Sequence, residues 1–340
     1  MDSAAPLGAE VSSACGHAVI QTSLMLLLSL AATSASAGER YALVITGASG
    51  GDQYARKYDT WRVTFVEMLQ RKFMYQRDHL LVLAEVESEG VQKATRDNVV
   101  RVLGDLRRRL AKDDQLLVLL IGHGSSLDGP GGEDAKFNLV GPDLSASEWA
   151  DLLRPIPGRL VFVNTSSASF PFLRRIAGKG RVVLTATDSS AQQFETVFPD
   201  FFLKAFDDDS ADFDKNGRVS IWEAFTYASG GVAQFFQQKG QLATERPLLD
   251  DTGAGVGREA QAPGPDGAIA KITYLEPEAP VALPADTGLA VLVKRRAEFE
   301  QQVEDLKARK DTIPPDQYDA ELERLLIEIA RLSVQIRTKS

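Results

Sequence analysis

Residues 116–124 read Leu-Leu-Val-Leu-Leu-Ile-Gly-His-Gly, an unbroken apolar run that ends in a histidine between two glycines. A strand with one face in water alternates apolar and polar residues, whereas this run has no polar position. Such runs are typical of strands in parallel sheets that are covered by helices on both faces. The run therefore predicts an α/β fold with a mostly parallel sheet.

Similar apolar runs lie on both sides of this stretch, and amphipathic segments separate them. The other strand candidates are 41–46, 80–86, 160–163 and 182–187. The helix candidates are 55–71, a segment capped by Thr95 that ends near residue 110, and 149–153 after a Ser145–Glu148 capping box. Alternating strands and helices of this kind indicate one α/β domain, which we place at residues 38–245.

Composition limits the classes of function. The chain has 340 residues, long enough for a sizeable core, with 47 acidic and 38 basic residues and a formal net charge of −9. This acidic balance argues against a general binder of nucleic acid or of anionic membranes. The single cysteine, Cys15, excludes a disulfide framework, a zinc ribbon and a C-x-x-C redox site.

Residues 1–37 have the pattern of a secretory signal peptide. An apolar stretch over 19–32 precedes Ala35-Ser36-Ala37, a small-residue pattern at which signal peptides are cleaved. Residues 1–18 contain no Lys or Arg, although a signal normally begins with positive charge, so an uncleaved N-terminal membrane anchor is the alternative. We expect an exported protein, periplasmic or secreted, and cleavage would remove Cys15 and leave no cysteine.

The composition changes after residue 245. Residues 246–287 are rich in Gly and Pro and are interpreted as a linker, in which 250–261 is a Gly-rich loop without metal. In 288–340, two apolar stripes at helical spacing are separated by Ile313-Pro314-Pro315-Asp316, which predicts a coiled-coil-like helical hairpin. The hairpin either folds back on the α/β domain or contacts a protein partner, which includes self-association with a second copy.

Residues 212–223 read Asp-Phe-Asp-Lys-Asn-Gly-Arg-Val-Ser-Ile-Trp-Glu and fill every position of an EF-hand-like calcium loop. Gly217 stands where the loop turns sharply. The alternatives are an acidic turn between helices or a loop that has lost its metal, and a single loop favours structural stabilisation over sensing. The predicted ligands of Ca2+ are Asp212, Asp214, Asn216, the backbone carbonyl of Arg218, Ser220 and, as the closing bidentate ligand, Glu223.

A second group of candidate residues follows two predicted strands. His123 comes after 116–121, and Asn164-Thr165-Ser166-Ser167 comes after 160–163. The carboxyl ends of parallel strands meet at the sheet edge where α/β folds bind ligands. If the two strands are neighbours, the histidine and one hydroxyl group would lie together, as a base and a nucleophile require.

With these motifs the chain resembles the caspase-like clan of cysteine peptidases, and within it the legumain-like (haemoglobinase) branch, over roughly residues 41–240. The resemblance rests on YALVITGASG at 41–50, LLVLLIGHG at 116–124 and LVFVNTSSAS at 160–169. It implies a caspase-like, mostly parallel sheet flanked by helices.

The same resemblance implies site residues. It places His123 on the family's catalytic histidine, Ser166 on the catalytic cysteine and Asn164 on the acidic residue before that cysteine. Arg56 and Asp188 fall near the family's substrate pocket.

The exchange of a thiol for a hydroxyl group decides what chemistry to expect. A thiol is partly ionised near neutral pH, so one histidine activates it, whereas a serine normally needs a base that a carboxylate orients. The sequence shows no Asp or Glu that would evidently orient His123. One hypothesis is therefore a degenerate, non-proteolytic peptidase scaffold with a binding or structural role. The others are an active endopeptidase or hydrolase with a Ser166–His123 dyad, and an activity of another kind.

Overall fold

The computed structural model describes residues 38–126, 134–277, 287–308, 310 and 313–339. The predicted signal peptide, its alternative as a membrane anchor, and Cys15 all fall on residues 1–37, outside this part. Within the described ranges, no helix is both long and apolar enough to cross a membrane.

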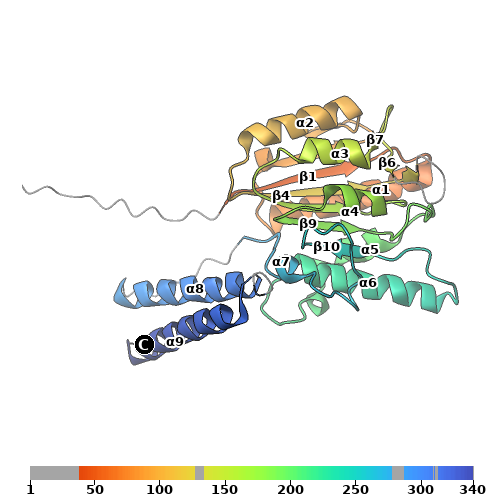
Figure 1. The fold of residues 1–340 in the computed structure, drawn as a ribbon. Coiled ribbons are helices and arrows are strands. Elements are labelled where there is room, and N and C mark those ends of the chain that lie inside the picture. Colours follow the sequence, from red (N-terminus) through yellow and green to blue (C-terminus); the bar gives the residue numbers. More distant parts are fainter. Residues whose placement is uncertain (1–37, 127–133, 278–286, 309, 311–312, 340) are drawn as a thin grey trace, which may run out of the picture. The chain divides into compact units, whose positions relative to one another are not determined.

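A seven-stranded sheet forms the centre of the α/β domain (Figure 1). Its strands are β1 (Arg40–Thr46), β2 (Leu80–Ala84), β3 (Val91–Lys93), β4 (Gln115–Ile121), β8 (Arg159–Asn164), β9 (Arg181–Thr185) and β10 (Leu248–Asp250). The order is β10-β9-β8-β4-β1-β2-β3, and all neighbours pair in parallel except β10, which is antiparallel to β9. The predicted α/β class with a mostly parallel sheet is confirmed.

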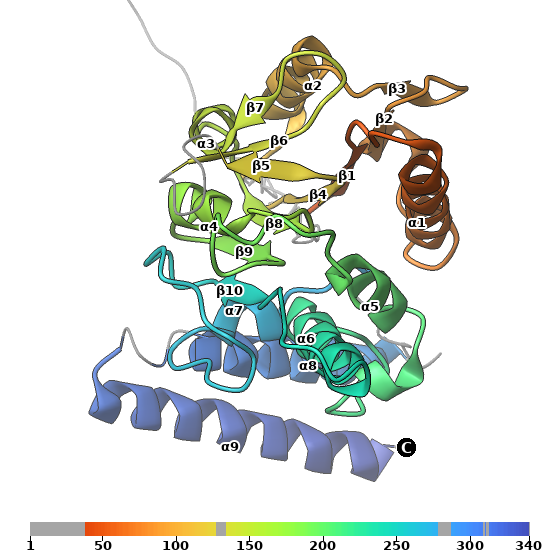
Figure 2. The same ribbon diagram turned by 90° about the vertical axis from the view of Figure 1, so that its right-hand side faces the viewer.

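Helices cover both faces of the sheet (Figures 1 and 2). One face carries α1 (Asp52–Arg71), α5 (Phe198–Ala205) and α6 (Ile221–Gln238), and the other carries α2 (Arg96–Arg109), α3 (Ala146–Leu153) and α4 (Phe170–Ile176). In β4, Leu117 and Leu119 pack into the first core, whereas Leu116 and Val118 pack into the second. Two buried faces therefore explain why this strand has no polar position after Gln115.

Short elements complete the domain. They are η1 (Arg77–His79), η2 (Asp209–Ala211), α7 (Ala268–Lys271) and an antiparallel sheet of β5 (Gly124–Ser126), β6 (Ala135–Phe137) and β7 (Leu144–Ser145). Two caps predicted from the sequence are confirmed, because the Thr95 hydroxyl accepts the Asn98 N–H and Ser145 forms a capping box with Glu148.

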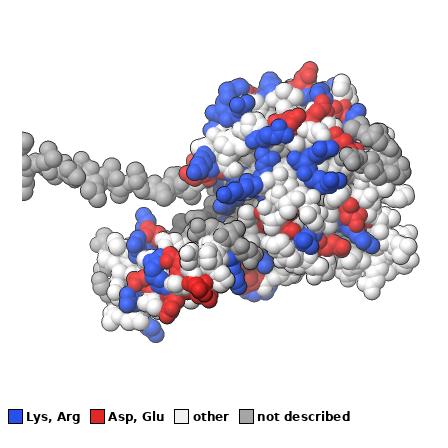
Figure 3. All heavy atoms as spheres, in the orientation of Figure 1, with Lys and Arg blue, Asp and Glu red and all other residues white. Residues whose placement is uncertain are grey.

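Basic side chains stand at the last turns of two helices on the second face. These are Arg107, Arg108 and Arg109 of α2 and Arg174 and Arg175 of α4. Cations stabilise helix C-termini because the peptide dipoles leave partial negative charge there. In Figure 3, Lys and Arg side chains gather over the part of the visible face that α2, α3 and α4 form, with fewer Asp and Glu side chains among them.

Part of the range interpreted as a linker belongs to the sheet, since β10 pairs with β9 there. Three residues are too few to show a strand period, which is why the sequence did not reveal this strand. The two carboxylates at its end accept hydrogen bonds from backbone N–H groups. Asp250 accepts the N–H groups of Gly253, Gly255 and Val256, and Asp251 accepts those of Gly267, Ile269 and Ala270 at the start of α7.

The helical hairpin consists of α8 (Thr287–Ala308) and α9 (Pro315–Lys339). The two predicted apolar stripes pack against each other and confirm the hairpin. Leu326 and Val334 of α9 remain about half exposed, at 50% and 55%. The buried members are Phe299, Val303 and Leu306 of α8 and Tyr318, Leu325 and Leu332 of α9.

A buried carboxyl group makes the stability of the domain depend on pH. Glu245 accepts the N–H groups of Val197 and Phe198, and burial raises the pKa of its carboxyl from 4.5 to about 7. The folded protein therefore holds this proton more tightly than the unfolded chain does. The contribution of Glu245 to the free energy of unfolding therefore falls as the pH rises from about 4.5 to about 7, and it levels off above that.

We predict that Glu245→Gln flattens this dependence. Between pH 5 and pH 8, the free energy of unfolding of the wild type should fall by up to about 3 kcal/mol more than that of the variant, since one pKa unit corresponds to about 1.4 kcal/mol. Urea unfolding across this pH range measures the difference, with the exposed Glu259→Gln as control. Parallel curves for wild type and Glu245→Gln would contradict the assignment.

Candidate functional site

The carboxyl edge of the sheet brings the predicted dyad residues onto adjacent strands. His123 follows β4, Ser166 follows β8, and these strands are neighbours with Leu120 beside Asn164. The turn after β1, on the other side of β4, contributes Ser49. Three adjacent strand ends thus build the site.

A backbone carbonyl and a phenol hold the imidazole of His123. Its Nε2 lies 3.1 Å from the carbonyl oxygen of Ser49 and 3.1 Å from Oη of Tyr58. Its ring centroid lies 4.7 Å from that of Tyr54, with the two rings in a T-shaped arrangement. A carbonyl only accepts hydrogen bonds, so Nε2 carries a proton and Nδ1 is the nitrogen left to act as a base. Among the described residues, no carboxylate bonds this ring.

Tyr54 and Tyr58 come from α1 and were not among the residues predicted from the sequence. Their spacing of four residues places them on one helix face, but the sequence does not tell which face meets the histidine. Burial, together with the charge of Glu195 and the phenol of Tyr54, raises the pKa of Tyr58. The phenol of Tyr58 therefore stays neutral beside the imidazole.

The hydroxyl group of Ser166 is fully buried and engaged elsewhere. It lies 2.7 Å from Oδ1 of Asn164 and 3.1 Å from the carbonyl oxygen of Ser167. Both Ser166 and His123 are described, and no hydrogen bond joins them. The structure thus brings the two residues to one edge without forming a nucleophile–base pair.

The hydroxyl groups around Ser166 also bind backbone. Ser167 donates to the Gly124 carbonyl at 2.9 Å and accepts the Gly124 N–H at 3.2 Å. Thr165 donates to the carbonyl of Leu120 at 2.8 Å. These hydroxyl groups tie the end of β8 to β4 and to the first residue of β5, which is a structural role.

The two residues predicted to lie near a substrate pocket belong to different elements. Arg56 is exposed on α1, whereas Asp188 follows β9 and has Arg246 as its ion-pair partner at 3.7 Å. Neither a hydrogen bond nor an ion pair connects Arg56 with Asp188 in the described part of the chain. Their shared role in a substrate pocket stays a prediction.

The predicted calcium loop is closed by the start of α6. Glu223 forms a capping box with Ser220 and also accepts the N–H groups of Phe213 and Asp214, which returns its carboxylate to the beginning of the loop. Gly217, at φ 82°, makes the sharp turn. Carboxylate oxygens of Asp212, Asp214 and Glu223 all lie within 4.8 Å of one another.

The chemistry of these groups suits a hard cation. Partial burial and the negative charges of Glu223 and Asp212 raise the pKa of Asp214, so a cation would relieve the crowding of charge. Calcium takes oxygen ligands, most often from carboxylates, amides and carbonyls. Asn216 lies in the same cluster, with its amide nitrogen 2.9 Å from Oδ2 of Asp214.

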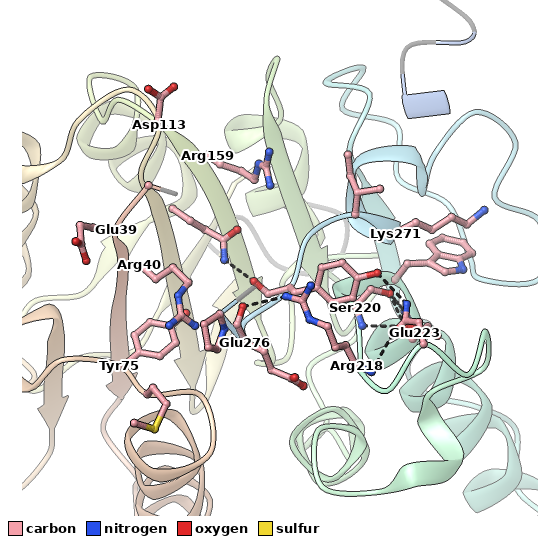
Figure 4. Close-up of a pocket in the computed structure, with 18 of the residues that line it drawn as sticks. Glu39, Arg40, Tyr75, Asp113, Arg159, Arg218, Ser220, Glu223, Lys271 and Glu276 are labelled. Carbon is pink, nitrogen blue, oxygen red and sulfur yellow. Dashed lines mark hydrogen bonds between the residues drawn. The ribbon is translucent and has the colours of Figure 1, made fainter. Parts of the chain in front are cut away.

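A cavity of about 1160 Å³ opens at the amino ends of the parallel strands, opposite the carboxyl edge (Figure 4). Arg40, Gln115 and Arg159, which line it, stand at the first positions of β1, β4 and β8. His123 and Ser166 follow the last residues of β4 and β8, so the cavity lies away from them. Its remaining wall includes Asp214, Ser220 and Glu223 of the predicted calcium loop.

The sequence matches no protein-family model and no curated protein. In structure, the chain is similar to protein GSU0716 from Geobacter sulfurreducens, with 15% identity and a TM-score of 0.39, over 62% of this chain and 92% of that one. It is also similar to the Drosophila initiator caspase Dronc, with 11% identity and a TM-score of 0.38, over 65% of this chain and 82% of that one. The fold class rests on the sheet itself, and these likenesses carry no argument about function.

Gly124 tests how tightly the carboxyl edge is packed. A methyl group on Gly124 would lie 2.1 Å from the carbonyl oxygen of Ser167 and 2.8 Å from Oγ of Ser166. We predict that Gly124→Ala lowers the free energy of unfolding by about 1–3 kcal/mol, the range for overpacking a close-packed site. Chemical denaturation measures the loss.

The matched control is Gly104→Ala on α2, where the nearest atom, a guanidinium nitrogen of Arg108, is 3.9 Å away. Because alanine favours helix more than glycine does, this variant should gain about 0.5–1 kcal/mol. Equal stability of the two variants would contradict the close approach of Gly124 to Ser166 and Ser167.

Proposed function

We propose that the protein is an exported, calcium-binding member of the caspase-like, legumain-like type that acts as a non-proteolytic scaffold with a binding or structural role. The observation that carries the proposal is the hydrogen bonding of the Ser166 hydroxyl group. Its hydroxyl group is buried and bonded to Asn164 and Ser167, while Nε2 of His123 is bonded to Ser49 and Tyr58.

Proton transfer explains why this arrangement favours inactivity. A serine attacks a carbonyl carbon only when a base takes its proton in the same step. The oxygen of an amide such as Asn164 accepts a hydrogen bond but takes up no proton at neutral pH. Ser166 therefore lacks the route for its proton that a hydrolase requires.

The competing function is a hydrolase that uses Ser166 and His123. One observation favours it, because the carbonyl of Ser49 orients His123 and leaves Nδ1 able to act as a base. In this hypothesis the backbone takes the orienting role of a carboxylate. Ser166 would have to leave Asn164 and turn toward the imidazole.

A serine-reactive fluorophosphonate separates the two functions. We predict no covalent label on Ser166 after incubation of the mature chain, because its hydroxyl group is buried and not activated. Peptide mass spectrometry locates any label, and Ser166→Ala and His123→Ala serve as controls. A label on Ser166 that disappears in His123→Ala would establish the hydrolase and end the scaffold proposal.

Calcium binding is supported by the complete loop at 212–223 and by the clustering of its carboxylates. The loop connects η2 with α6, so a bound ion would hold the start of α6 to the turn before it. Calcium would neutralise the charges of Asp212, Asp214 and Glu223, and the chain would supply the oxygen ligands. This role is structural and involves no catalytic step.

We predict that a chelator lowers the melting temperature of the wild type and leaves Glu223→Gln unchanged. Gln keeps an oxygen for the capping box but loses the bidentate carboxylate that closes the loop. At calcium about one hundred times Kd, binding adds about 2.7 kcal/mol to the stability, which is several degrees. Differential scanning calorimetry measures the shift, with Glu259→Gln as a control that should retain it; an unchanged wild type would refute calcium binding.

Export and partner binding complete the proposal. Export is supported by the signal-like pattern of residues 1–37. A contact with a protein partner or a second copy is supported by the outward side of α9, where Leu326, Ile327 and Val334 are between 43% and 55% exposed. The hairpin cluster already buries the other apolar side of α9.

A further inference from the structure

Residues 273–276, here called the strap, follow α7 and run along the calcium loop at the cavity. Three side chains donate to three consecutive carbonyl oxygens of the strap. Gln115 donates to Tyr274 at 2.9 Å, Arg40 to Leu275, and Arg218 to Glu276 at 3.1 Å. Figure 4 shows Arg40, Arg218 and Glu276 around the cavity, with Ser220 and Glu223 of the calcium loop beside them.

The calcium loop contacts the strap through three of its predicted ligand residues. Asn216 places its amide nitrogen 3.1 Å from Oη of Tyr274. The guanidinium of Arg218 lies 3.9 Å above the ring of Tyr274. Ser220 forms a β-bridge with Tyr274, and the next N–H, of Ile221, donates to the carbonyl of Thr273 at 2.8 Å.

These contacts restrain the loop in a conformation that suits metal binding. Tyr274 holds the nitrogen side of the Asn216 amide, so the oxygen side remains within the loop, where it accepts the Arg218 N–H at 2.9 Å. Stacking on Tyr274 fixes the side chain of Arg218, whose backbone carbonyl is a predicted ligand. A loop that is ordered before binding loses less conformational entropy when the ion arrives, and it binds more tightly.

We propose that the strap is an integral part of the calcium site: Tyr274 and the side chain of Arg218 preorganise the loop and set its affinity for Ca2+. The inference rests on the calcium binding proposed above. Because coupling between two sites is reciprocal, bound calcium in turn stabilises the strap.

Isothermal titration of the mature chain with Ca2+ tests the proposal. Tyr274→Ala removes both the hydroxyl contact with Asn216 and the platform under Arg218, and it should raise Kd about tenfold, within the usual range of coupling between sites. Tyr274→Phe removes only the hydroxyl contact and should raise Kd less. Because Tyr274→Phe keeps the ring, it remains informative if Tyr274→Ala does not fold.

The matched control is Tyr41→Phe. Tyr41 packs in the second core, with its ring stacked on His79, and belongs to neither the loop nor the strap. The same chemical change at this position should leave Kd unchanged. If the wild type binds no calcium, the proposed function fails; if it binds and both Tyr274 variants retain the wild-type Kd, the strap inference alone is overturned.

Amide hydrogen exchange gives a second, independent readout. The Ile221 N–H bonded to the strap should exchange several-fold more slowly with calcium in the wild type, and this gain should shrink in Tyr274→Ala. Glu223→Gln should show no calcium effect at Ile221. Calcium protection of Ile221 that is equal in the wild type and Tyr274→Ala would contradict the coupling.

Discussion

Burial of both faces of the sheet is the constraint on which the rest of the structure depends. Every residue of β4 is buried, and its side chains alternate between two separate cores. A polar side chain within such a strand would lose its hydration without a partner. Polar side chains that could bind a ligand or take part in a reaction are therefore confined to the strand ends, where His123 and the segment 164–167 lie.

The same low-polarity surroundings explain why the hydroxyl groups that follow β8 are all hydrogen-bonded within the protein. A buried hydroxyl group must find a hydrogen-bond partner or cost stability, and Thr165, Ser166 and Ser167 each find one in the nearest carbonyl or amide oxygen. A thiol at position 166 would be under far weaker pressure to do so, since sulfur is a weak donor. A thiol at this position would thus differ from the hydroxyl group of Ser166 in packing as well as in reactivity.

Patterns of periodicity and capping made most of the fold predictable. The apolar runs identified the central strands, and Ser145 and Glu148 revealed their capping box because cap spacing is local. Contacts between distant segments were not predictable. The meeting of Tyr58 with His123 and of Tyr274 with Asn216 depends on how helices and turns dock, which no local period encodes. The carboxylates of 212–223 were predictable because one short loop holds all of them.

The geometry of the sheet separates the loop at 212–223 from the carboxyl edge. Arg40 and Gln115, which hold the strap, begin β1 and β4, whereas Ser49 and His123 follow the far ends of the same strands. Each strand has seven residues, so the two edges lie roughly 20 Å apart at about 3.3 Å per residue. Close-packed cores on both faces resist any sliding of β1 against β4. If the loop at 212–223 binds calcium as proposed, the described part of the chain therefore offers the ion no bistable element through which to act on His123, which favours a stabilising role over a switching one.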